Sequence, residues 1–80
     1  MHIAILGPGC ANCHTLAKRT REALAELGLD AEVTAVTDYA TIAGYGVSST
    51  PALAVDDRVV LTGQVPSVAR IREILTAAHG

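Results

Sequence analysis

The hydrophobic pattern changes period several times along the chain, and each change predicts a new element. Residues 2–6 are almost continuously apolar, which is typical of a strand covered on both faces of a sheet. Gly7, Pro8 and Gly9 end this run. Between residues 11 and 27 apolar positions recur every three or four residues, which predicts an amphipathic helix that ends at Gly28. Its stripe consists of Leu16, Thr20, Ala23, Leu24 and Leu27.

The rest of the chain continues with shorter segments of alternating type. They predict a strand over 31–36, a helix over 39–45, strands over 52–55 and 58–61, and a helix over 67–78. Asp38 is expected to cap the short helix, in which Tyr39 and Tyr45 are interpreted as packing residues. Asp56 and Asp57 alone separate the two short strands, which predicts a tight hairpin. The apolar stripe of the last helix consists of Val68, Ile71, Leu75 and Ala78.

The order of these elements, β-α-β-α-β-β-α, predicts an α/β fold. The opening strand, helix and strand form a βαβ unit, whose two strands should be parallel with a right-handed crossover. The later hairpin adds antiparallel strands. We therefore expect a four-stranded mixed sheet flanked by helices on both faces, formed by residues 1–80 as a single domain.

The charge and the lengths of the apolar runs argue against two classes of binding partner, nucleic acids and membranes. Six Lys and Arg residues against eight Asp and Glu residues give a formal charge of −2, which argues against a nucleic-acid partner. No apolar run approaches the roughly 20 residues needed to cross a bilayer, so we expect no membrane partner. The start of the chain lacks the basic region of a signal peptide, so we expect a cytoplasmic protein, whose thiols are mostly reduced. We expect it to be a monomer.

Both cysteines lie three residues apart at the predicted start of the long helix. At this spacing they can meet on one face of the first turn, where they could form a disulfide or share a metal ion. Cys10 would lie at the helix N-terminus, where free N–H groups and the helix dipole favour a thiolate, the form that attacks disulfides. Cys13, one turn further, could then resolve the mixed disulfide. His14 could add positive charge or simply face solvent.

The first strand, the Cys10-x-x-Cys13 motif and the segment Ser49-Thr50-Pro51-Ala52-Leu53 before the hairpin together resemble the thioredoxin fold. The most similar branch is that of the small redox-active disulfide proteins of bacteria and archaea, and the resemblance covers nearly the whole chain. It implies a thiol–disulfide oxidoreductase whose redox group is the Cys10–Cys13 disulfide, without another cofactor. It also implies that Pro51 is cis and that the backbone of Thr50 hydrogen-bonds a bound substrate chain.

The resemblance further implies disulfide-containing protein or small-molecule substrates and an electron donor similar to thioredoxin reductase. The motif departs from thioredoxin in two places, because Gly9 stands where thioredoxin has an aromatic residue and Ala11-Asn12 replaces Gly-Pro. The redox potential therefore does not carry over. Gly9 and His14 are the candidates for tuning the thiolate.

Three alternatives share these residues. Cys10-x-x-Cys13-His14 matches the haem c attachment signature, but that class needs an exported chain and an axial ligand, and Met1 is the single methionine. A soft-metal carrier module would also place two cysteines before a helix. Such modules end in a strand, whereas a helix is expected at this C-terminus. The third alternative is a non-catalytic adaptor built on the thioredoxin scaffold.

Overall fold

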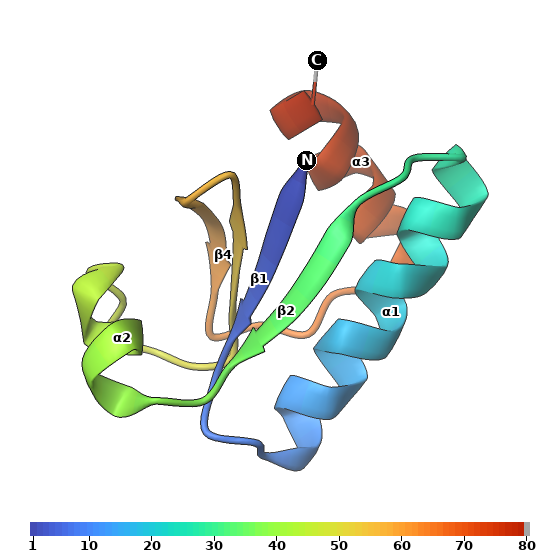
Figure 1. The fold of residues 1–80 in the computed structure, drawn as a ribbon. Helices are drawn as coiled ribbons and strands as arrows, with labels where there is room; N and C mark the ends of the chain where they lie inside the picture. Colours follow the sequence, from blue (N-terminus) through green and yellow to red (C-terminus); the bar gives the residue numbers. More distant parts are fainter. Residues whose placement is uncertain (80) are drawn as a thin grey trace.

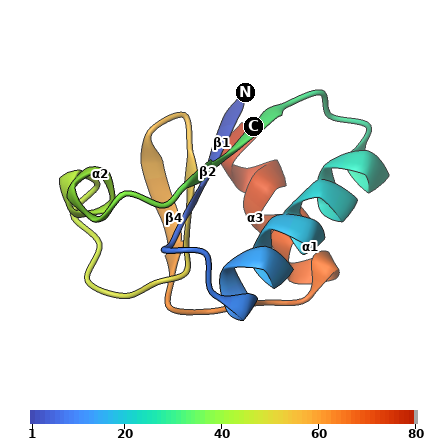
Figure 2. The same ribbon diagram turned by 60° about the horizontal axis from the view of Figure 1, so that its bottom comes forward.

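A four-stranded mixed sheet in the order β2-β1-β3-β4 forms the centre of the computed structural model, which describes residues 1–79 (Figure 1). Helices α1 and α3 pack side by side on one face of the sheet, and α2 lies on the other (Figures 1 and 2). Every predicted element is present, which confirms the α/β fold. The elements are β1 (His2–Leu6), α1 (Ala11–Leu27), β2 (Glu32–Val36), α2 (Tyr39–Gly44), β3 (Ala52–Val55), β4 (Arg58–Thr62) and α3 (Val68–His79).

The central position of β1 explains why its sequence is apolar throughout. It pairs in parallel with β2, where His2 lies opposite Glu32, and antiparallel with β3, where Leu6 lies opposite Ala52. Because β1 is covered on both faces, alternate side chains enter different clusters of the core. The cluster under α1 and α3 contains Ile3, Ile5, Leu16, Ala23, Leu24, Leu53, Val55, Ile71 and Leu75. The cluster under α2 contains Ala4, Leu6, Ile42, Ala52 and Ala54.

Capping residues and turns form as the sequence predicts. The Asp38 carboxylate accepts hydrogen bonds from the backbone N–H and the hydroxyl of Thr41, both at 2.9 Å, and these bonds hold the pKa of Asp38 below its ordinary value. Gly28 ends α1 with a φ of +67°. Asp56 and Asp57 form the hairpin turn with φ values of 50° and 68°, a conformation that Asp tolerates better than most residues.

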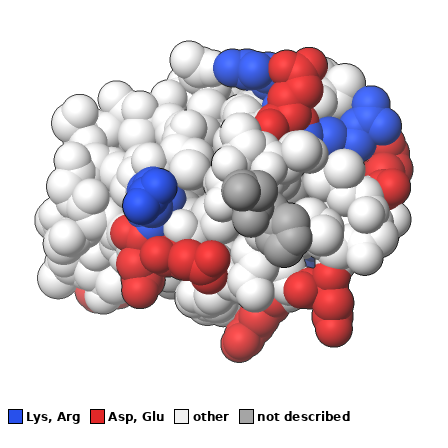
Figure 3. All heavy atoms as spheres, turned by 90° about the horizontal axis from the view of Figure 1, so that it is seen from above, with Lys and Arg blue, Asp and Glu red and all other residues white. Residues whose placement is uncertain are grey.

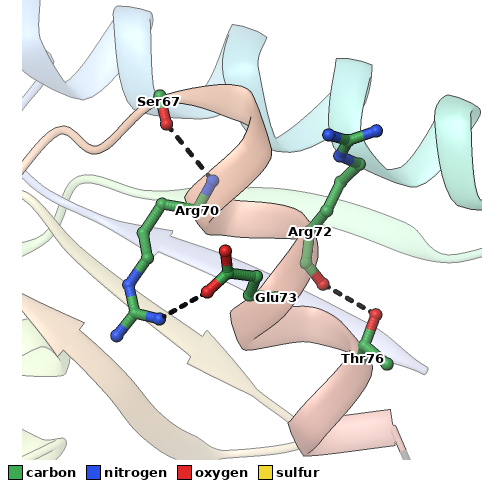
Figure 4. Close-up of polar contacts among 5 residues, drawn as sticks. All are labelled: Ser67, Arg70, Arg72, Glu73 and Thr76. Carbon is green, nitrogen blue, oxygen red and sulfur yellow. Dashed lines mark hydrogen bonds and ion pairs between the residues drawn. The ribbon is translucent and has the colours of Figure 1, made fainter.

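The polar contacts of α3 include those near its start and one ion pair to α1. The Ser67 hydroxyl accepts a hydrogen bond from the Arg70 backbone N–H at 3.2 Å, and the Arg70 guanidinium pairs with Glu73 at 2.9 Å (Figure 4). Arg72 lies 2.7 Å from Glu26 of α1. Both ion pairs are at least partly exposed to solvent, so their contribution to stability is small compared with that of the buried Ile71 and Leu75.

The prediction that Tyr39 and Ala78 pack against the core is wrong. Tyr39 is 74% exposed, because Ile42, Tyr45 and Val47 fill the space between α2 and the sheet. Ala78 is also exposed, near the end of α3. The element boundaries differ from the predicted ones by one residue at most. Within residues 1–79, no helix combines the length and apolarity that crossing a membrane requires.

Candidate active site: the disulfide at the start of α1

A disulfide joins Cys10 to Cys13 across the first turn of α1, and their Cα atoms lie 5.1 Å apart. Cys10 is the N-cap residue, with extended backbone angles, and it is exposed to solvent. Cys13 is 5% exposed and faces the interior. An incoming group can therefore reach the sulfur of Cys10, whereas the protein shields that of Cys13.

The backbone around Cys10 is arranged to favour negative charge on its sulfur. The Cys13 N–H donates to Cys10 Sγ at 3.2 Å. Cys10 also sits at the N-terminus of a 17-residue helix whose first turn contains no acidic residue. Because the helix dipole is positive at this end, both features stabilise a thiolate once the disulfide is reduced.

The segment before β3 forms a second wall beside the disulfide. Pro51 is buried and follows a cis peptide bond, and Thr50 next to it is exposed. A Cβ placed on Gly7 would overlap Cys13 Sγ and would lie 3.9 Å from the Cα of Pro51, so the three residues lie close together. The structure thus brings Thr50 and Pro51 to the same end of the sheet as the cysteines, as the loops at the lower end of Figure 1 show.

Gly7 is a site residue that the sequence analysis treated only as part of a turn. It is buried, and its N–H donates to the carbonyl of Val36 at 2.9 Å. Because a side chain here would occupy the space of Cys13 Sγ, the missing Cβ is what allows the sulfur to pack against the end of β1. The available signal was a glycine placed directly after a fully apolar strand and just before the cysteine motif.

The two candidate tuning residues face solvent. His14 is exposed, and its backbone N–H donates to the carbonyl of Cys10 at 3.1 Å. Gly9 is also exposed, and its φ of +90° lies in the region that favours glycine, so it allows the chain to turn from Pro8 into the helix cap. Among residues 1–78, no three His, Cys, Asp or Glu side chains come together as metal ligands.

Three of the segments that meet at this end of the sheet contain no charged residue, whereas the segment after β2 contains Asp38. Residues 7–17, 45–55 and 62–69 include no Lys, Arg, Asp or Glu. Charged side chains of both signs are visible at the opposite end of the molecule (Figure 3). Because residues 7–17 include no Lys, Arg, Asp or Glu, the helix N-terminus and its N–H groups are the main electrostatic influence on Cys10 from its own segment.

Comparisons with known proteins agree with this geometry. Residues 1–76 match the family model described as thioredoxin domain. A protein named thioredoxin from Methanothermobacter thermautotrophicus is 43% identical over 76 residues, which cover 95% of this chain and 99% of the relative. Another of that name, from Methanocaldococcus jannaschii, is 44% identical over 73 residues, which cover 91% of this chain and 84% of the relative.

Proposed function

The chain belongs to the thioredoxin family and is a thiol–disulfide oxidoreductase, and from this premise we propose that Cys10 is its attacking thiol and Cys13 its resolving thiol. The observation that carries the assignment is the difference in burial, because Cys10 is exposed and Cys13 is 5% exposed. The Cys13 N–H, 3.2 Å from Cys10 Sγ, supports the same order by favouring a thiolate on the outer residue.

In the proposed reaction the reduced protein transfers two electrons to a substrate disulfide. The Cys10 thiolate attacks one substrate sulfur, the substrate S–S bond breaks, and a mixed disulfide to Cys10 forms while the other substrate sulfur takes up a proton. Cys13 loses its proton to solvent, and the resulting thiolate attacks Cys10 Sγ. The Cys10–Cys13 disulfide forms, the mixed disulfide breaks, and the second substrate sulfur leaves as a thiolate that is protonated from solvent.

The second wall is proposed to bind the substrate chain. Thr50 is exposed beside the buried Pro51, and we propose that its backbone groups are available to a substrate next to the disulfide. An extended substrate segment could hydrogen-bond this backbone and place its own disulfide at Cys10. This mode of binding reads the main chain and not a particular side chain, so it suits substrates of varied sequence.

The cycle requires a source of electrons that returns the disulfide to the dithiol. We propose a flavoenzyme similar to thioredoxin reductase as that donor, and the cytoplasm as the compartment. The proposed cycle uses the two cysteines as its redox group and needs no further cofactor. Gly9 and His14 remain proposed tuning residues, and their exposure is compatible with an effect on the thiolate through charge or loop geometry.

The alkylation of Cys10 tests the proposed order of the thiols. Because the helix N-terminus and the Cys13 N–H both favour its thiolate, the pKa of Cys10 in the reduced protein is expected below the value of about 8.5 for a free cysteine. The measurement is the rate of iodoacetamide modification against pH, with mass spectrometry assigning the modified residue. The same chain in concentrated urea is the control, and an equal midpoint in both conditions would contradict the assignment.

A further inference from the structure

The side chain of Arg19 links α1 to the segment between β4 and α3. Its Nη1 atom donates to the carbonyl of Val65 at 3.1 Å and to that of Pro66 at 3.2 Å. These carbonyls lie in residues 63–67, outside any helix or strand. The partly buried guanidinium therefore provides hydrogen-bond donors for two carbonyl groups that lie outside the helices and strands. It also fixes one end of residues 63–67 against α1.

The other end of residues 63–67 contacts the segment with Thr50 and Pro51, which is the proposed substrate-binding wall of the active site. The N–H of Gly63 donates to the carbonyl of Pro51 at 2.8 Å. Gly63 has a φ of +66°, and a Cβ there would lie 3.2 Å from the Cβ of Ser49, so the two loops are in close contact. Residues 63–66 are therefore in direct contact with the segment that carries Thr50 and Pro51.

These contacts connect the two sides of the active site through a path that does not pass through the sheet. One side is α1, which carries Cys10 and Cys13 in its first turn, and the other is the segment with Thr50 and Pro51. We propose that Arg19 is a positioning residue that sets the spacing between the disulfide and this substrate wall. The proposal rests on the substrate-binding role proposed above for Thr50 and Pro51.

The role of Arg19 concerns binding and not the chemistry of the thiols. Cys10 and Cys13 are held by the N–H of Cys13 and the helix cap, so we expect their reactivity to change little when Arg19 is replaced. A protein substrate needs the correct spacing between both walls, whereas a small aromatic disulfide needs only Cys10. Loss of Arg19 should therefore impair protein substrates selectively.

The test compares Arg19→Met with Arg21→Met, which removes the same charge from an exposed position on the same helix. Arg19→Met is expected to raise KM for a protein disulfide such as insulin about three- to tenfold, the effect of one or two lost hydrogen bonds. The kcat for insulin, the rate with a small aromatic disulfide and the redox potential should match those of Arg21→Met. Equal KM values in the two variants, or an equal loss with both substrates, would overturn the proposal.

The buried Ile71 and Leu75 still join α3 to the core when Arg19 is replaced, so the variant is expected to fold. If Arg19→Met is too unstable to assay, Arg19→Lys compared with Arg21→Lys replaces it. Arg19→Lys is expected to raise KM for insulin about two- to threefold, because lysine can keep only part of the two hydrogen bonds to the carbonyls of Val65 and Pro66. An unchanged KM would overturn the proposal. Failure of the proposed function itself would look different, because the unmodified protein would then not reduce insulin.

Discussion

Replacement of Cys13 by serine is expected to leave the protein covalently attached to its substrate through Cys10. The variant retains the exposed thiol that we propose attacks the substrate, but it lacks the buried thiol that we propose breaks the mixed disulfide. Turnover of insulin should fall to the background rate, and a stoichiometric mixed disulfide should accumulate. Nonreducing electrophoresis and intact mass spectrometry measure the adduct directly.

The Cys10→Ser variant is the matched control, because it also retains one thiol of the pair. It is expected to lose turnover to the same extent without trapping substrate, since Cys13 is 5% exposed. Equal trapping by both variants would show that the assigned order of the thiols is wrong. A trapped adduct on Cys13 alone would reverse the assignment.

Replacement of Gly7 by alanine is expected to destabilise the protein, and more strongly in its oxidised form than in its reduced form. The added Cβ would overlap Cys13 Sγ, which cannot move away while it is bonded to Cys10. Overpacking of this kind costs about 1–3 kcal/mol. In the reduced protein the Cys13 side chain can turn aside, so oxidised Gly7→Ala should lose more stability than its reduced form.

That difference has a second consequence, because a less stable disulfide is easier to reduce. The potential of the Cys10–Cys13 pair should become less negative by about 20–60 mV, the equivalent of about 1–3 kcal/mol for two electrons. Equilibration with a dithiol buffer measures the potential, and urea unfolding of both redox forms measures stability. Gly44→Ala is the control, because a Cβ there meets no atom within 4 Å. An unchanged potential in Gly7→Ala would refute the packing role of Gly7.

Features that depend on residues close in sequence could be predicted. The apolar run of β1, the stripe of α1 and the Asp38 cap are local patterns, and each is present in the structure. The CxxC motif is local as well, so its place at a helix start was predicted from the sequence, but its spacing left a disulfide and a shared metal ion open. The thiol–disulfide chemistry was implied by the resemblance to thioredoxins. The resemblance to thioredoxins then added Thr50 and Pro51, which are distant in sequence from the cysteines.

The contacts that could not be predicted join distant parts of the chain. Gly7 is adjacent to Cys13 because β1 ends beside the first turn of α1, and nothing in its neighbours indicates that a sulfur fills the space of its side chain. Arg19 donates hydrogen bonds to carbonyls 46 and 47 residues away. In the sequence it cannot be told apart from the exposed Arg21 of the same helix. Tyr39 was misplaced for a related reason, since its burial depends on which side chains already fill the space under α2.

The central place of β1 in the sheet also sets an order of events during synthesis. The strand pairs with β2, whose last residue is Val36, and with β3, whose first residue is Ala52. Because the chain leaves the ribosome from its N-terminus, both cysteines emerge before Thr50 and Pro51 do. For that interval the emerged part of the chain carries a dithiol without the segment that we propose to bind its substrates. Reaction with unintended disulfides is thus a hazard of biogenesis that ends when β3 joins the sheet.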